Sequence, residues 1–196
     1  MKRLIFFCMV FSLSAAIANA VPALDIDDEF DQIYELSSKD PNNKPTIVAF
    51  IEIVQERAKS GTSNFKSVGQ LVNYLADDYS LYANLHKEVL PAYCIAQGVD
   101  IGSYAKAFIS ANEQTSLRVN RAYTILGTNY QLVWEHLKAP AMNNTAWLAN
   151  KISQTLKVPE SEICARLESA PADAATTLSY SAQNFSRNEI MRFLSP

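Results

Sequence analysis

The fold class follows from a stretch in the middle of the chain, IGSYAKAFISANEQTSLRVNRAYTILGTNYQLVWEHL, residues 101–137. Side chains suited to a core recur in it every three or four residues, which is the spacing of one helix face. The members of this face are Tyr104, Phe108, Ala111, Thr115, Val119, Ala122, Leu126, Tyr130, Val133 and Leu137. A single helix of this length would extend about 55 Å at 1.5 Å per residue. We therefore expect a break or bend near residues 110–116, where Ser110 and Glu113 match a capping box.

Helical spacing continues toward the N-terminus. A first short helix is indicated by Ile26, Phe30, Ile33 and Leu36, with an acidic cluster at its start, where the helix dipole favours negative charge. Ser67 and Gln70 form a capping-box signature before a longer helix, which Pro91 should kink or end. A further turn should carry Cys94 and close at Gly98.

The segment from Thr46 to Lys59 is the least clear. It begins with β-branched residues typical of a buried strand, but it continues with helix-forming residues and stops at Gly61. No partner strand is visible in the sequence, which favours a helix over a strand.

Toward the C-terminus, prolines and capping residues predict several short helices. We expect Pro140 to end the central region, Asn144 to cap a helix over 145–157, and Pro159 to open a short helix through Glu168. Pro171 should begin another, and Ser186 with Glu189 should cap the last one. Five glycines are too few for a turn-rich sandwich or barrel. The sequence thus predicts an all-α, single-domain bundle of about seven to nine helices over residues 21–196.

Residues 1–20 have the form of a cleavable signal peptide. Lys2 and Arg3 precede a short apolar stretch, and Ala18 and Ala20 supply the small side chains that a signal peptidase requires. The alternative is a buried N-terminal helix, but the polar residues at helical spacing that such a helix would carry are lacking. The large residues before Cys8 argue against lipid attachment there. We expect export by a bacterial route, cleavage after Ala20, and a periplasmic or secreted protein.

Charge and hydropathy limit the partners of the mature chain. The signal holds two of the 17 basic residues and none of the 20 acidic ones, so its removal leaves a net charge of about −5. Nucleic acid and anionic membrane surfaces are therefore unfavourable partners. The longest apolar run after the signal, Ile47 to Ile51, has five residues, far short of a membrane span.

Two cysteines remain after removal of the signal, Cys94 and Cys164. In an oxidising compartment they are expected to form one disulfide, which would stabilise the fold by roughly 4 kcal/mol in the chain-entropy model. The alternative is a pair of buried free thiols. A redox-active pair is disfavoured because the two residues are far from a C-x-x-C spacing.

The best polar constellation in the sequence is Asp78, Tyr82 and His86, which recur every fourth residue and so share a helix side. One interpretation is a ligand-binding or proton-handling stripe. The other, which we favour, is a partly exposed face with one internal hydrogen-bond chain.

Other motifs give no catalytic residue, cofactor site or metal site. Neither His86 nor His136 has a partner at metal-ligand spacing, and a calcium loop from Asp25 fails because its sixth and twelfth positions are Phe30 and Leu36. No nucleophile motif or glycine-rich phosphate loop is present. Carboxylates could still converge from separate helices, and the candidates nearest to apolar runs are Glu52, Asp78 and Glu113.

These observations lead to three hypotheses of function. The first is a non-enzymatic exported protein that binds another exported or envelope protein, as an adaptor, inhibitor, immunity factor or chaperone; the nine tyrosines, suited to contact surfaces, support it. The second is a small-molecule or lipid carrier with an internal apolar cavity. The third is an envelope hydrolase whose carboxylates are brought together by the fold.

Overall fold

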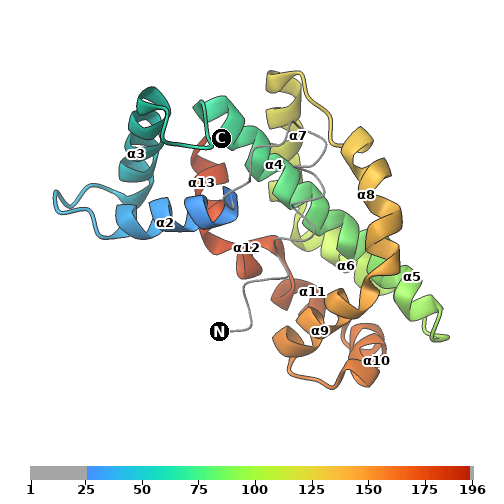
Figure 1. Ribbon diagram of the computed structural model, residues 1–196. Coiled ribbons are helices and arrows are strands. Elements are labelled where there is room, and N and C mark those ends of the chain that lie inside the picture. Colours follow the sequence, from blue (N-terminus) through green and yellow to red (C-terminus); the bar gives the residue numbers. More distant parts are fainter. Residues whose placement is uncertain (1–25, 195–196) are drawn as a thin grey trace. The chain divides into compact units, whose positions relative to one another are not determined.

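The structure is a computed structural model that describes residues 26–194. Within this part of the chain the regular structure is helical throughout, and no strand occurs (Figure 1). The prediction of an all-α fold is therefore confirmed. The predicted signal peptide, with Cys8, lies outside the described residues.

The helices group into two compact units, of which the first ends at Leu71 and the second begins at Val72. The boundary falls within helix α4 (Val68–Asn84). The expectation of one domain over residues 21–196 stays a prediction.

In the first unit, helices α2 (Ile26–Ser38) and α3 (Thr46–Ser60) pack against each other. Their contact is built on Phe30 and Phe50, which are fully buried and have ring centroids 5.0 Å apart. The segment from Thr46 to Lys59 is therefore a helix, as predicted, and not a strand. It ends at Gly61, whose φ of 72° lies in the left-handed region that glycine adopts without strain.

Helix α4 begins with the predicted capping box. The backbone N–H of Gln70 donates to Ser67 Oγ at 3.1 Å. The Gln70 side chain reaches back and accepts from the backbone N–H of Lys66 at 2.7 Å, one residue before the position usual for a capping box. Two donors at the start of the helix are satisfied in this way.

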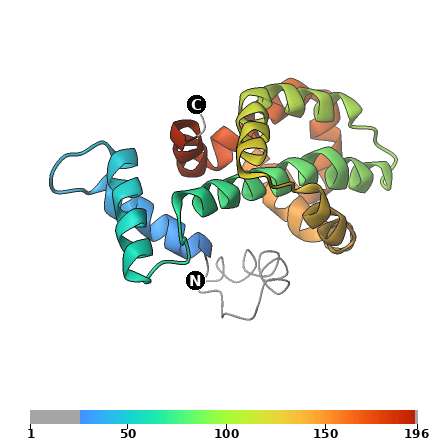
Figure 2. The ribbon, with the colours of Figure 1, turned by 90° about the horizontal axis from the view of Figure 1, so that it is seen from above.

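Helix α4 continues through a π-helical turn, η1 (Leu85–Val89), into α5 (Leu90–Ile95), as the green run in Figures 1 and 2 shows. Pro91 does not end the helical run. Proline cannot donate to the preceding turn and crowds its carbonyl, and the wider π turn directly before Pro91 lets the chain continue past it. The turn with Cys94 closes at Gly98, as predicted, with a φ of 80°.

The central stretch contains three helices, α6 (Gly102–Ala111), α7 (Glu113–Leu126) and α8 (Gln131–Asn143). The expected break is confirmed and falls at Asn112. The predicted capping box at Ser110 is wrong, because Asn112 holds the N-cap position and its side chain bonds elsewhere. A second break, not predicted, occurs at Gly127, whose φ is 65°.

The expected end of this region at Pro140 is also wrong, because Pro140 lies inside α8 and the helix continues to Asn143. Near a helix end only one backbone bond is lost to proline, and the remaining turn can still form. Helix α9 (Thr145–Leu156) begins after Asn144 as predicted, although the Asn144 side chain makes no capping bond.

The C-terminal part is made of short pieces: η2 (Glu160–Glu162), α10 (Ile163–Ser169), α11 (Pro171–Thr177), α12 (Tyr180–Gln183) and α13 (Phe185–Leu194). Pro159 and Pro171 precede or open helices as expected. Ser186 lies within the first turn of α13, so the last predicted capping box is wrong. The described residues hold more helices than the seven to nine expected, because several predicted helices are divided.

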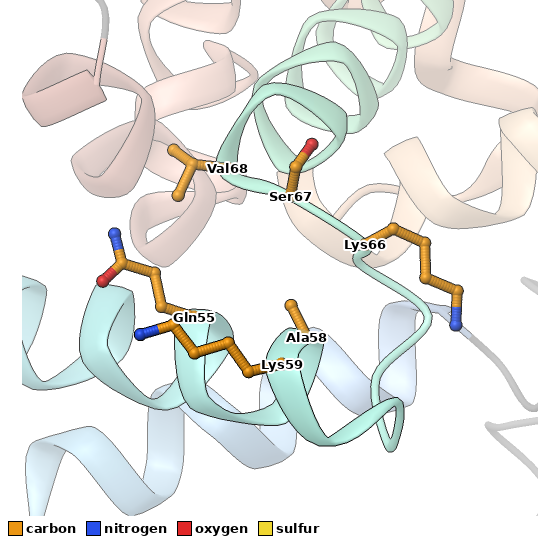
Figure 3. A pocket seen from close by; sticks show the side chains of 6 residues that line it. All are labelled: Gln55, Ala58, Lys59, Lys66, Ser67 and Val68. Atoms are coloured by element: carbon orange, nitrogen blue, oxygen red, sulfur yellow. The ribbon is translucent and has the colours of Figure 1, made fainter.

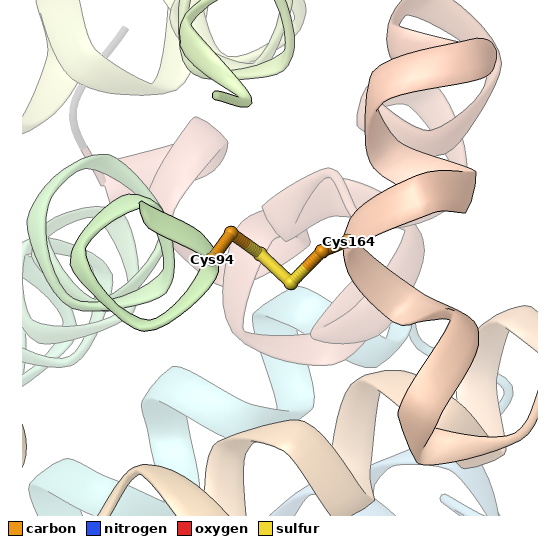
Figure 4. Close-up of a disulfide and its surroundings, with 2 residues drawn as sticks. All are labelled: Cys94 and Cys164. Atoms are coloured by element: carbon orange, nitrogen blue, oxygen red, sulfur yellow. A yellow bond between two sulfur atoms is a disulfide. The ribbon is translucent and has the colours of Figure 1, made fainter. Parts of the chain in front are cut away.

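A disulfide between Cys94 and Cys164 joins α5 to α10 (Figure 4). Its Cα atoms are 5.4 Å apart, and both residues are buried. The predicted pairing is confirmed. It lies in the core of the second unit, where α6 packs on α11, α5 on α9, and α10 on α9, α11 and α6.

None of the helices between residues 26 and 194 combines the length and the apolar character needed to cross a bilayer.

Candidate functional site

Asp78, Tyr82 and His86 lie on successive turns of the helical run formed by α4 and η1. Asp78 and His86 are buried, and Tyr82 is half-buried. The four-residue spacing therefore does align them on one side of the run. That side is turned into the second unit, where each residue has a partner from a remote element.

Asp78 is engaged by two residues from the C-terminal helices. The Tyr180 hydroxyl donates to Asp78 Oδ2 at 2.5 Å, and Arg187 Nε lies 3.9 Å from the same oxygen. Arg187 and Asp78 are both nearly enclosed, so they form a buried ion pair between α4 and α13. Arg187 Nε also donates to the Tyr74 hydroxyl at 3.3 Å. Burial and the adjacent Asp78 charge raise the pKa of Tyr180 well above its ordinary value, so this phenol stays protonated and donates.

Tyr82 connects the polar groups to a cluster of aromatic rings. Its hydroxyl donates to the Leu178 carbonyl at 2.7 Å, which satisfies a backbone acceptor just before α12. Its ring lies 5.6 Å from that of Tyr180 and 4.5 Å from that of His86, measured between centroids. Tyr82 therefore both anchors α12 and fills the space between its two neighbours.

His86 is held as a neutral imidazole. Its ring stacks on Phe108 with centroids 4.6 Å apart, and its Nδ1 lies 2.6 Å from the Tyr104 hydroxyl. Burial lowers the pKa of His86 to about 3 and raises that of Tyr104 well above its ordinary value. Both groups are therefore neutral near pH 7, and one hydrogen bond joins Nδ1 to the phenol oxygen, with the donor set by the imidazole tautomer.

Each of the three residues makes its own hydrogen bond to a remote element, ring contacts of Tyr82 join them, and little of their surface is exposed. The sequence predicted the side of the helix but not the partners Tyr104, Tyr180 and Arg187. The expected partly exposed face is wrong, because Asp78 and His86 are buried by those packed elements. Tyr104 lies 18 residues from His86 and Tyr180 lies 102 residues from Asp78, so no local spacing could have indicated them. A role as a binding stripe for a ligand stays a prediction.

A second network on α4 was missed in the sequence. Asp77 accepts from the Tyr123 hydroxyl at 2.8 Å and from the Asn73 side chain at 2.9 Å. The network extends to Ser80 Oγ, 3.0 Å from the Tyr123 hydroxyl, and to Thr128, which donates to Asn73 Oδ1 at 2.8 Å. The recurrence of Asn73, Asp77 and Ser80 at intervals of four and three was a signal that could have found it.

Asp77 differs from Asp78 in its surroundings. Burial raises the pKa of the Asp77 carboxyl to about 6, while the hydrogen bonds from Tyr123 and Asn73 act in the opposite direction. Asp77 accepts hydrogen bonds from the neutral Tyr123 and Asn73 side chains, whereas Asp78 faces the Arg187 guanidinium. The two adjacent carboxyl groups on this helix thus have different partners, neutral donors at Asp77 and a cation at Asp78.

The first unit contains an open depression of about 460 Å³, lined by Gln55, Ala58, Lys59, Lys66, Ser67 and Val68 (Figure 3). Its two ammonium groups suggest an anion, but one of them is already engaged. Lys66 Nζ points away from the other lining side chains and donates to the Ser63 carbonyl at 2.7 Å. The Ser67 hydroxyl is taken up by the capping bond of α4. This depression therefore resembles a surface hollow more than a prepared ligand site.

The three candidate carboxylates are placed differently. Glu52 is exposed in the first unit and pairs with Lys44. Asp78 is buried and bonded, and Glu113 is exposed in the first turn of α7. Among the described residues, no group of three or more His, Cys, Asp or Glu side chains is arranged to hold a metal ion.

Comparisons with protein-family models, with curated proteins and with solved structures found no match for this chain.

Proposed function

We propose that this chain is an exported helical protein that acts by binding another protein. The observation that carries the proposal is the contrast between the polar and the apolar side chains of the second unit. The polar groups around Asp77 and Asp78 are buried or half-buried and hydrogen-bonded, while several large apolar side chains are turned to solvent. The most exposed of these are Ile95, Ile109, Ile125, Leu132, Phe185 and Phe193.

An enzyme or a small-ligand site generally needs the opposite arrangement, with polar groups converging on a concave surface. Single exposed apolar residues are ordinary, but Ile125 keeps 81% of its surface accessible in a unit that buries its polar networks. Binding to another protein would remove such surface from water and so be favoured by the hydrophobic effect. The buried disulfide is consistent with an exported protein, since such bonds persist in oxidising compartments.

Native mass spectrometry of the protein purified from the envelope of its own host, without reductant, tests this proposal. We expect the mass of residues 21–196 less two hydrogens, together with a stoichiometric second protein. A bound mass of lipid size would favour a carrier instead. The bare chain as the only species would contradict the proposal.

A further inference from the structure

Helix α7 presents an outer face to solvent that differs from its inner face. The inner residues, Thr115, Val119 and Ala122, are small and buried. The outer residues Leu117 and Ile125 are large, branched and respectively 49% and 81% exposed. Leu117, Arg121 and Ile125 follow one another at intervals of four, so they lie on adjacent turns. We call Leu117, Arg118, Arg121 and Ile125 the α7 stripe.

The α7 stripe also differs from the rest of the chain in charge. Glu113, in the first turn, is the only acidic residue of α7, and two arginines lie between Leu117 and Ile125. The chain as a whole carries more acidic than basic residues. Arginine is enriched at protein interfaces, because its planar guanidinium pairs with carboxylates and its stem packs on apolar surface.

We infer that the α7 stripe is the docking surface for an exported protein that presents an apolar groove bordered by carboxylates. This inference rests on the proposed function and names the surface and the chemistry of the partner. The helix would lie in the groove with Leu117 and Ile125 as apolar anchors about two turns apart on one face, close to the i and i+7 anchors of helices that bind in grooves. Arg118 would meet the acidic rim, which favours this partner over basic or neutral ones.

Site-specific photo-crosslinking in the cell that makes the protein tests the surface. A benzophenone amino acid is placed at Leu117, at Ile125 or, as a matched control, at Ile109, an aliphatic residue of α6 that is 54% exposed. We expect the same adduct from both α7 positions and none from position 109. Sequencing of the crosslinked peptide should give a partner segment with Asp or Glu beside apolar residues.

Charge reversal tests the chemistry. Arg118→Glu should lower the yield of the adduct at position 125 about tenfold, the change that 1.4 kcal/mol of binding free energy produces. Lys106→Glu, on the exposed side of α6, should leave the yield unchanged. Melting temperatures of both variants show that each still folds.

Three results would overturn the inference: an adduct to a second copy of this chain, a partner segment that is basic, or equal labelling at position 109. A second protein in the native mass spectrum without an α7 adduct would overturn the docking surface alone. If neither crosslinking nor native mass spectrometry finds a partner, both the docking surface and the proposed function are contradicted.

Discussion

Two long-range ties join the helical run of α4, η1 and α5 to the C-terminal part of the second unit, and they differ in chemistry. At α5 the tie is the covalent bond between Cys94 and Cys164. At α4 it is the polar network of Asp78 with Tyr180 and Arg187. The covalent tie is indifferent to pH and sensitive only to reductant that can reach it. The polar tie depends on every partner being present, because a buried charge left without its counter-ion is strongly unfavourable.

The largest effect is expected at the covalent tie. Cys94→Ser should lower the free energy of unfolding by about 4 kcal/mol, because the 70-residue loop is no longer closed in the unfolded chain. Cys164→Ser should have a similar effect, and the double variant should be no worse than either single one. Urea unfolding without reductant measures all three, and additive losses would contradict a structural role for the bond.

Breaking the polar tie should cost slightly less. Arg187→Met removes the cation beside Asp78 and should lower the free energy of unfolding by about 3 kcal/mol. The matched control is Arg192→Met on the exposed side of the same helix, for which we expect little change. In the double variant with Asp78→Asn, part of the loss should return, because the orphaned charge is removed. If Arg187→Met and Arg192→Met lowered the free energy of unfolding equally, the buried pair of Asp78 and Arg187 would not stabilise the fold.

The two ties also differ in how far the sequence predicted them. Counting cysteines after removal of the signal sufficed for the disulfide, because only two remained to pair. Helical spacing placed Asp78, Tyr82 and His86 on one side, but it carries no information about which distant elements pack there. The failed capping box at Ser110 has the same origin. The Asn112 side chain accepts from the backbone N–H of Tyr180 at 2.8 Å, a contact across 68 residues that fixes the N-cap at Asn112 instead.

His86 contacts the polar tie only through the ring of Tyr82, and its burial should make stability fall in acid. His86 has a folded pKa of about 3, well below its ordinary value of 6.5, so below pH 6.5 the unfolded chain binds a proton that the folded chain does not. Between pH 7 and pH 5 this should lower the free energy of unfolding by about 2 kcal/mol. The measurement is best made in an Asp77→Asn background, since Asp77 titrates with the opposite sign.

NMR titration provides the direct check. The imidazole signals of His86 should show no protonation step between pH 7 and pH 5. A protonation step of His86 within that range, in the folded protein, would contradict the neutral imidazole.

Asp77 contrasts with Asp78 on the same helix. It is partly buried, and it accepts its hydrogen bonds from the neutral Asn73 and Tyr123 side chains. Its pKa is raised to about 6, so ionisation is unfavourable in the folded state and stability falls as the pH rises from 3.8 through 6. Asp77→Asn should therefore raise the free energy of unfolding at pH 7 by about 1 kcal/mol, discounted for partial exposure, and have little effect at pH 4. Thermal unfolding of Asp77→Asn and of the unchanged protein at pH 7 and pH 4 measures both effects. A variant that is equally destabilised at both would mean that the carboxylate is needed by Tyr123 and Asn73 in its charged form.

The smallest effect is expected at Tyr130, which borders the same aspartates. Within the described residues its hydroxyl is buried without a hydrogen-bond partner, so Tyr130→Phe removes a group that contributes no bond there. The free energy of unfolding should change by less than about 0.5 kcal/mol, or rise. Tyr123→Phe is the matched control, because it breaks the bonds to Asp77 and Ser80 and should cost about 1 to 2 kcal/mol. If Tyr130→Phe proves as costly as Tyr123→Phe, the Tyr130 hydroxyl is bonded in solution and belongs to the Asp77 network, which would then extend from Ser80 to the start of α8.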